Sequence, residues 1–275
     1  MSRNWVEETI EVERAKPMRL RISRAAAPDA PEILHLHGGA FLGSLESGNL
    51  VSTFLADAGA TVVAIDYPTG PENPFPRALE AIYRALCWAH EECAFGKNRK
   101  LFVVGEEAGG NLAAGLTLMA RDQGGPPLAG QILLSPMLDP CMATRSIRKA
   151  EAGPVGCKWA DGWHLYLGSA DKASHPYASP LGSSRLTGLP PALVLTAEDD
   201  PMRDESLAYA RRLRDSGVMV EEHVLPAPTL WPDSFHQLGK AEPPWAETLR
   251  NLFAAFLIRT GPSRPSVTAL AKRSS

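Results

Sequence analysis

The chain has 275 residues, of which 44% are hydrophobic and 21% charged, with a formal net charge of -3 at pH 7. This balance is typical of a globular protein with a large core, and it excludes the strongly basic surface of a nucleic-acid-binding protein. The stretch from Met1 to Glu8 is polar and acidic, unlike a signal peptide, and no apolar run is long enough to span a bilayer. We therefore expect neither a nucleic-acid nor a membrane partner.

The spacing of the cysteines indicates the cellular compartment and whether a metal site is present. They are scattered without the spacing of a zinc site, at Cys87, Cys93, Cys141 and Cys157. This pattern favours reduced thiols in a cytoplasmic protein, with no metal and no cofactor.

Strands and helices alternate along the chain. Two short alternating segments, 7–12 and 18–23, suit an antiparallel edge pair. The further strands are expected at 33–37, 61–65, 101–104, 130–134, 191–196 and 218–225, and the helices at 49–59, 77–92, 108–121, 203–216 and 245–259. Such alternation predicts an α/β fold, a mainly parallel central sheet with helices on both faces and a ligand site beyond the carboxyl ends of the strands.

One long connection interrupts the alternation. Residues 138–180 are rich in glycine, proline and aromatic residues, so we expect an irregular small lid over the site. The whole is expected to be a single domain, 1–262, followed by a mobile tail at 263–275, which is rich in Ser, Pro, Lys and Arg.

A tight turn follows the strand that starts at Leu101. Glycines at Gly105 and Gly109 frame it, and a helix follows. A strand, a tight turn with glycines at both ends and a helix form the frame of the nucleophile elbow, G-x-S-x-G, in which the turn leaves no room for a Cβ atom at the glycines. The centre of the frame should be serine, and here it is Glu107.

Four motifs in chain order resemble the hormone-sensitive-lipase family of α/β-hydrolases, in its bacterial esterase branch. The resemblance runs from about Ile33 to Phe256 and implies an α/β-hydrolase fold with an ester-like substrate or small-molecule ligand. The motifs are His37-Gly38-Gly39-Ala40-Phe41, Asp66-Tyr67 with Pro71-Glu72-Asn73-Pro74-Phe75-Pro76, Gly105-Glu106-Glu107-Ala108-Gly109-Gly110-Asn111-Leu112, and Thr196-Ala197-Glu198-Asp199-Asp200-Pro201-Met202-Arg203-Asp204-Glu205.

The resemblance implies roles for several residues. The oxyanion-hole amides would come from Gly38, Gly39 and Ala108. The triad acid falls on Asp200, with Asp199 as its neighbour in register. The triad histidine falls on Leu230, which cannot accept a proton; the nearest alternative base is His236, which is expected on the surface or in the cap.

With serine and histidine both replaced, conventional serine esterase activity is not expected. One hypothesis is a pseudoenzyme in which the Glu107 carboxylate folds into the oxyanion hole, accepting from Gly38, Gly39 or Ala108. The alternative is an active non-serine hydrolase, lyase or cyclase with Glu107 as nucleophile or general base and His236 as its partner. A serine replaced deliberately to trap substrate is disfavoured, because the triad histidine is lost as well.

The surroundings of the site follow from the same resemblance. Only about thirty residues precede the oxyanion loop and they do not read as cap helices, so the pocket should be more open than in the family. Pairing through 218–225 and 245–259 would give a homodimer. The residues expected to line the pocket and lid are His37, Phe41, Glu106, Trp159, Trp163 and Tyr166.

Overall fold

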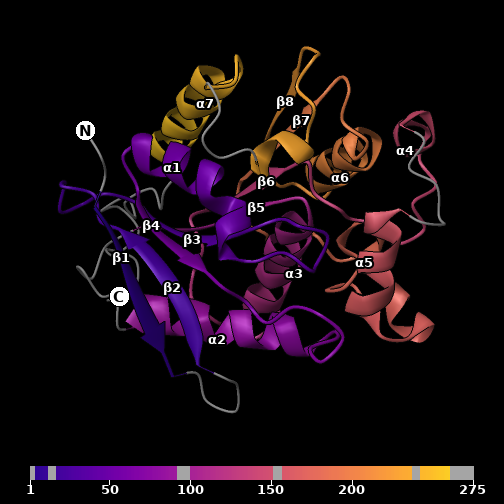
Figure 1. Cartoon of the computed structure of the whole chain (residues 1–275), viewed down its shortest axis with the longest axis horizontal. Coiled ribbons are helices and arrows are strands. Elements are labelled where there is room, and N and C mark those ends of the chain that lie inside the picture. Colours follow the sequence, from indigo (N-terminus) through magenta and orange to yellow (C-terminus); the bar gives the residue numbers. More distant parts are fainter. Residues whose placement is uncertain (1–3, 12–16, 92–99, 151–156, 237–241, 261–275) are drawn as a thin grey trace, which may run out of the picture.

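The computed structural model describes residues 4–11, 17–91, 100–150, 157–236 and 242–260. Within these ranges the strands form an eight-stranded sheet in the order β1-β2-β4-β3-β5-β6-β7-β8 (Figure 1). β2 pairs antiparallel with β1 and β4, and every other pairing is parallel. The strands are β1 Trp5–Ile10, β2 Met18–Ser23, β3 Glu32–Leu36, β4 Thr61–Ile65, β5 Leu101–Glu106, β6 Gly130–Leu134, β7 Ala192–Ala197 and β8 Val220–Leu225.

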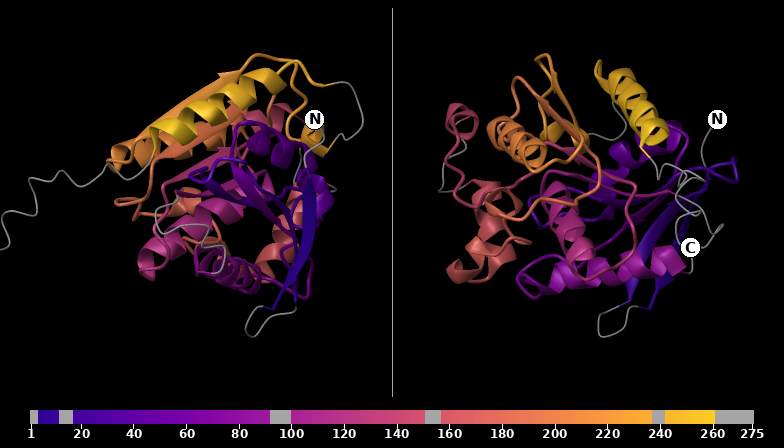
Figure 2. Two further views of the ribbon diagram at one scale, coloured as in Figure 1. Left: turned by 90° about the vertical axis from the view of Figure 1, so that its left-hand side faces the viewer. Right: turned by 180° about the vertical axis from the view of Figure 1, so that it is seen from behind.

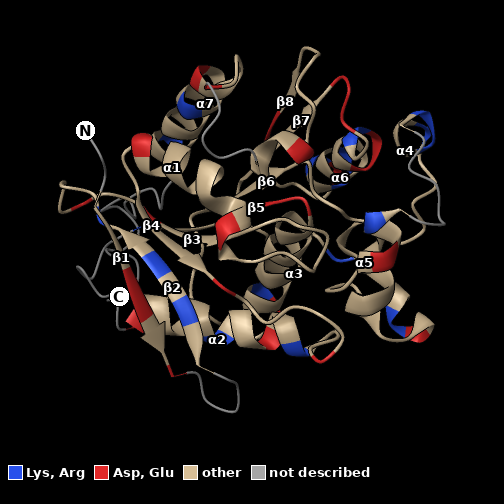
Figure 3. Ribbon diagram, in the orientation of Figure 1, with Lys and Arg blue, Asp and Glu red and all other residues tan. Residues whose placement is uncertain are grey.

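Opposite charges pair along the antiparallel edge. Glu7 of β1 lies across from Arg21 of β2, and Arg24 is 3.4 Å from Glu8. Figure 3 shows acidic residues on β1 and basic residues on β2. Charged side chains on an edge also discourage pairing with a further strand. The predicted antiparallel edge pair is confirmed.

Helices cover both faces of the sheet (Figures 1 and 2). α1 and α7 pack on one face, and α2, α3 and α6 pack on the other. None of the helices in the described ranges is both long and apolar enough to cross a membrane. The helices are α1 Asn49–Asp57, α2 Arg77–Glu91, α3 Ala108–Asp122, α4 Arg145–Lys149, α5 Lys158–Leu167, α6 Arg203–Asp215 and α7 Ala246–Arg259.

Alternate strand residues build two cores. Phe102 and Val104 of β5 pack toward α1 and α7, whereas Val103 packs toward α2, α3 and α6. Successive side chains of a strand point to opposite faces, so a strand buried on both sides is apolar throughout. The predicted fold class, a mainly parallel sheet with helices on both faces, is confirmed.

The lid differs from the expectation of an irregular segment. Residues 138–180 contain α4, α5 and a 3-10 turn at Ala170–Ser174. Trp159, Trp163 and Tyr166 recur at helical spacing and are buried on one side of α5. The surrounding glycines and prolines concealed this pattern in the sequence. α4 and α5 lie at the end of the molecule away from β1 and β2 (Figures 1 and 2).

The sheet register brings two loops together. Leu36, the last residue of β3, lies beside Gly105 of β5, so the loops that follow these neighbouring strands emerge side by side. This is the carboxyl edge of the parallel strands, where ligand sites of such sheets lie. The tail predicted at 263–275 falls outside the described residues.

Candidate functional site: the elbow at Glu107

The elbow has the geometry that its glycines predict. Glu107 joins β5 to α3 with φ 54° and ψ -116°, which is strained for a residue with a side chain. A Cβ atom at Gly105 would overlap the backbone of Gly109, and one at Gly109 would overlap the carbonyl of Leu36. Only glycine fits at either end of this turn. The turn presents the Glu107 side chain to the loop after β3, where it is completely buried.

The loop after β3 directs backbone amides at the Glu107 carboxylate. Gly39, Ala40 and Phe41 have φ values of 104°, 51° and 61°. The amides of Gly39 and Ala40 both donate to Glu107 Oε2, the latter at 3.1 Å. Successive amides turned to one side form a concave anion site. The carboxylate therefore occupies the position where these amides would hold an oxyanion.

The donor set differs from the expected one at Gly38. Its amide donates to Glu106 Oε1 at 3.1 Å and so faces away from Glu107. Ala40, one residue past the two predicted glycines, takes its place. Ala108 begins α3 and is buried beside the turn, and its role as a donor stays a prediction.

The lid closes over the carboxylate. The indole N–H of Trp159 donates to Glu107 Oε1, so Trp159 is a polar partner as well as an apolar wall. Gly162 packs against the carbonyl of Ala40 so tightly that a Cβ atom there would overlap it. One turn further on, Tyr166 stacks on Phe41 with ring centroids 4.1 Å apart. The elbow itself is closed, because α5 packs directly on the loop; that the pocket is more open than in the family stays a prediction.

The position expected for the triad histidine lies away from the site. Leu230 is 65% exposed. Its amide and that of Thr229 donate to the carboxylate of Asp199, at 3.0 and 2.7 Å. Asp200 instead accepts from Ser135 and Thr196 inside the protein, at 2.7 and 2.6 Å. The predicted acid, Asp200, is therefore turned away from the loop that it was expected to orient, and its neighbour Asp199 holds that loop.

His236 reaches the elbow from a 3-10 turn at Asp233–His236. Its Nε2 lies 3.8 Å from Glu107 Oε2, and its Nδ1 is 2.9 Å from the carbonyl oxygen of Ser47. The expectation of a surface or cap histidine is wrong, because the chain from Leu230 folds back toward α1 and leaves the His236 side chain only 26% exposed. His236 is the base nearest to the nucleophile position among the described residues.

The two side chains form an ion pair. Burial opposes the charge on Glu107, but His236, the Gly39 amide and the Trp159 indole more than offset it, so the pKa of Glu107 lies below its ordinary value. Burial likewise lowers the pKa of His236, while Glu107 and the Ser47 carbonyl raise it to about 9. At neutral pH the carboxylate is ionised and the imidazole is protonated, so this histidine cannot serve as a base without losing its partner.

A second carboxylate, that of Glu106, fixes the loop after β3 by accepting from the amide of Gly38. His35 Nε2 lies 2.6 Å from Glu106 Oε2, and His35 Nδ1 lies 2.7 Å from the hydroxyl of Ser52. All three side chains are buried. The chain Ser52–His35–Glu106–Gly38 has the residue types of a catalytic triad, yet it is enclosed and fixes the loop instead. Sequence reasoning missed His35 and Ser52; the signal was a polar pair in otherwise apolar elements.

The other predicted pocket residues make packing contacts, and Trp163 also lines a separate pocket in the lid. His37 stacks on Tyr67 with centroids 4.2 Å apart, and its Nδ1 lies 2.8 Å from the Gly38 carbonyl oxygen. Trp163 packs against Phe41 at 5.1 Å. In the part of the chain that the structure describes, no group of three or more His, Cys, Asp and Glu residues is arranged to hold a metal ion.

Comparison with known proteins places this geometry in a family. Residues 33–229 match the family described by the α/β-hydrolase fold. The carboxylesterase NlhH of Mycobacterium tuberculosis is 34% identical over 214 residues, covering 74% of this chain and 67% of the relative. An arylesterase of Saccharolobus solfataricus is 36% identical over 194 residues, covering 68% of this chain and 63% of the relative. The chain thus spans about two thirds of the length of these curated relatives.

Solved structures agree with the sequence matches. Esterase LipW from Mycobacterium marinum superposes with a TM-score of 0.80 at 33% identity, covering 94% of this chain and 81% of that one. An esterase from the archaeon Pyrobaculum calidifontis gives a TM-score of 0.80 at 32% identity, covering 93% and 86%. The fold, the strained elbow and these matches together show that the chain belongs to the hormone-sensitive-lipase family of α/β-hydrolases.

Proposed function

We propose that this protein is a pseudo-hydrolase that lacks serine esterase activity and binds a small molecule. The observation that carries the proposal is the Glu107 carboxylate held by the amides of Gly39 and Ala40 and by the indole of Trp159. An ester carbonyl needs those amides free, because oxyanion-hole donors act on the charge that develops during acyl transfer. The side chain in the nucleophile position therefore blocks the place where the reaction would be stabilised.

The other parts of an acyl-transfer site support the same proposal. Glutamate replaces the nucleophilic serine, and Leu230 at the histidine position points into solvent. Ser135 is buried and donates to Asp200, so it offers no alternative nucleophile. We therefore do not extend the ester substrates of the relatives to this chain.

We further propose a cytoplasmic location, because the cysteines are scattered along the sequence and Cys87, Cys141 and Cys157 are free thiols.

A carboxylate mechanism is the second candidate, and the position of His236 favours it. Its Nε2 is 3.8 Å from Glu107 Oε2, so a base lies beside the carboxylate. Glu107 would displace a leaving group from an electrophilic carbon of the substrate and form a covalent ester. Esterification removes the anion that keeps His236 protonated, so neutral His236 could then take a proton from a water that attacks the ester carbonyl, which regenerates the carboxylate and releases an alcohol. Against this, Glu107 is completely buried, and both of its oxygens already accept hydrogen bonds.

Turnover of a short aryl ester, 4-nitrophenyl acetate, separates the two candidates. We expect no turnover above background by the native chain. Glu107→Ser empties the oxyanion site and places a hydroxyl on the elbow beside His236, so turnover should appear and should disappear again in Glu107→Ser/His236→Ala. Native turnover that Glu107→Ala abolishes would establish the carboxylate mechanism instead. A silent Glu107→Ser variant that folds normally would show that the carboxylate is not what silences the site.

A further inference from the structure

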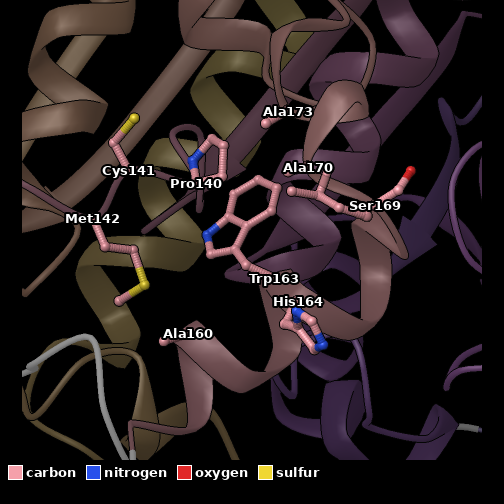
Figure 4. A pocket seen from close by; sticks show the side chains of 10 residues that line it. Pro140, Cys141, Met142, Ala160, Trp163, His164, Ser169, Ala170 and Ala173 are labelled. Carbon is pink, nitrogen blue, oxygen red and sulfur yellow. The ribbon is translucent and has the colours of Figure 1, made fainter.

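A cavity of about 420 Å³ lies within the lid, away from the elbow (Figure 4). Its walls are the segment 140–142 after β6, the outer part of α5 and the turn at 169–173. Glu107, the oxyanion loop and Trp159 are not among its lining residues. The volume lies within the range of pockets that hold drug-sized molecules. It is therefore a separate space, and the closed elbow does not block it.

The lining indicates an uncharged ligand. It contains no Asp, Glu, Lys or Arg, and its large side chains are those of Met142, Trp163, His164 and Leu167, with the hydroxyl of Ser169 at its edge. A charged ligand group would therefore meet no acidic side chain and no Lys or Arg in this lining. Met142 has a flexible and polarisable side chain that adapts to ligand shape. The cavity thus suits a compact hydrocarbon part, such as one or two aromatic rings.

Trp163 adds a polar requirement. The indole N–H of Trp159 donates to Glu107, whereas among the described residues none accepts from that of Trp163. Trp163 is only 3% exposed, and its ring stands at the centre of the cavity lining (Figure 4). The N–H is not among the buried polar atoms that lack a partner, so it is accessible from the pocket, where it can donate to a bound molecule. A ligand oxygen would supply it, and the ring face would stack on the ligand.

We propose that the lid cavity binds a neutral, mostly aromatic molecule that carries a hydrogen-bond acceptor oxygen, such as a phenol or an aryl ketone. This inference rests on the proposed function, because it gives a non-hydrolysing protein its ligand site. It places recognition on Met142 and on Trp163, which lies one turn of α5 after Trp159, the residue that closes the elbow.

The probe for the test is 2-naphthol, titrated against the full chain by isothermal calorimetry at pH 7. For a ligand of this size we expect a Kd on the order of 0.1 mM. Ala170→Trp fills the cavity from an exposed position and should raise the Kd at least tenfold. The matched control, Ala27→Trp, adds the same side chain to an exposed loop outside the cavity and should bind like the native chain. Trp163→Phe keeps a ring but removes the donor, and should bind several-fold more weakly.

Cysteine labelling locates the probe independently. Cys141 lines the cavity and is exposed, whereas Cys87 lies in α2 and is half-buried. Bound 2-naphthol should slow iodoacetamide modification of Cys141 and leave that of Cys87 unchanged, as measured by peptide mass spectrometry. Equal binding by the native chain and Ala170→Trp, or no protection of Cys141, would overturn the cavity assignment. Native ester turnover would overturn the proposed function alone, since the calorimetry measures the cavity whatever the elbow does.

Discussion

Two regions of the molecule share α5 and use it in opposite ways. At the elbow, Trp159 donates to an ionised carboxylate, and the space is full. At the lid cavity, Trp163 lies one turn later on the same helix, its N–H has no acceptor among the described residues, and it lines a pocket of about 420 Å³. The difference is that Trp159 meets the Glu107 carboxylate, whereas Trp163 meets the lining of the pocket. It teaches that one lid helix can close the elbow and still leave a separate pocket accessible.

The largest expected effect is on stability, and it compares a substitution at the elbow with one at the cavity. Glu107→Leu leaves the buried donors of Gly39, Ala40 and Trp159 without an acceptor and His236 without its anion, so we expect the free energy of unfolding to fall by about 3–5 kcal/mol. Met142→Leu, the matched change at the cavity, should cost less than about 1.5 kcal/mol. Urea unfolding of both variants measures the difference. Equal small losses would mean that the carboxylate network contributes little.

A smaller effect is expected on the pH dependence of stability, through the Glu107–His236 pair at the elbow. The pKa of His236 is raised from 6.5 to about 9, so its contribution to stability is complete below pH 6.5 and is lost as the pH rises through about 9. The pKa of Glu107 is lowered, so its contribution is present above pH 4.5 and is lost as the pH falls through the lowered value. The stabilisation by this pair therefore declines on both sides of neutrality.

The substitution His236→Gln tests the loss of stability that we expect at alkaline pH. The native chain should be more stable than this variant by about 1–3 kcal/mol at pH 6, and the difference should shrink toward zero by pH 10. Urea midpoints at several pH values give the comparison, and titrations common to both proteins cancel. A difference that stays constant from pH 6 to pH 10 would contradict the ion pair.

The smallest effect is expected at Leu230. Its side chain is 65% exposed, and the contact with Asp199 comes from its backbone amide. Leu230→Ala should therefore change the free energy of unfolding by no more than about 0.5 kcal/mol. Leu230→His added to Glu107→Ser should not increase ester turnover above that of Glu107→Ser alone. An increase would show that the loop brings position 230 to the elbow.

The fold and the elbow were predictable because their signals are local. Apolar runs of two periodicities mark the strands and helices, and Gly105 and Gly109 mark a turn that admits no other residue. The expected plug was correct in placing Glu107 on the Gly39 amide. Predicting Ala40 in place of Gly38 required the backbone dihedrals of the loop, which three consecutive positive φ values determine.

The rest depended on the path of the chain in space. His236 approaches Glu107 because the segment after Leu230 turns back toward α1, and no spacing rule encodes that path. Asp199 and Asp200 are adjacent, so a small rotation of the turn decides which one faces the Thr229 loop. The helix α5 was hidden by the glycines and prolines around it, although its aromatic spacing was present.

The contact between Gly162 and the carbonyl of Ala40 has a consequence for access to this site. The lid rests on the loop at a point where a hydrogen atom is all that fits, and this contact involves neither carboxylate. A single added methyl group would push α5 away from the loop and carry Trp159 with it, so Glu107 would keep the amides of Gly39 and Ala40 but lose its indole donor. Access of solvent to the elbow and the hold of the amides on the carboxylate thus depend on different contacts.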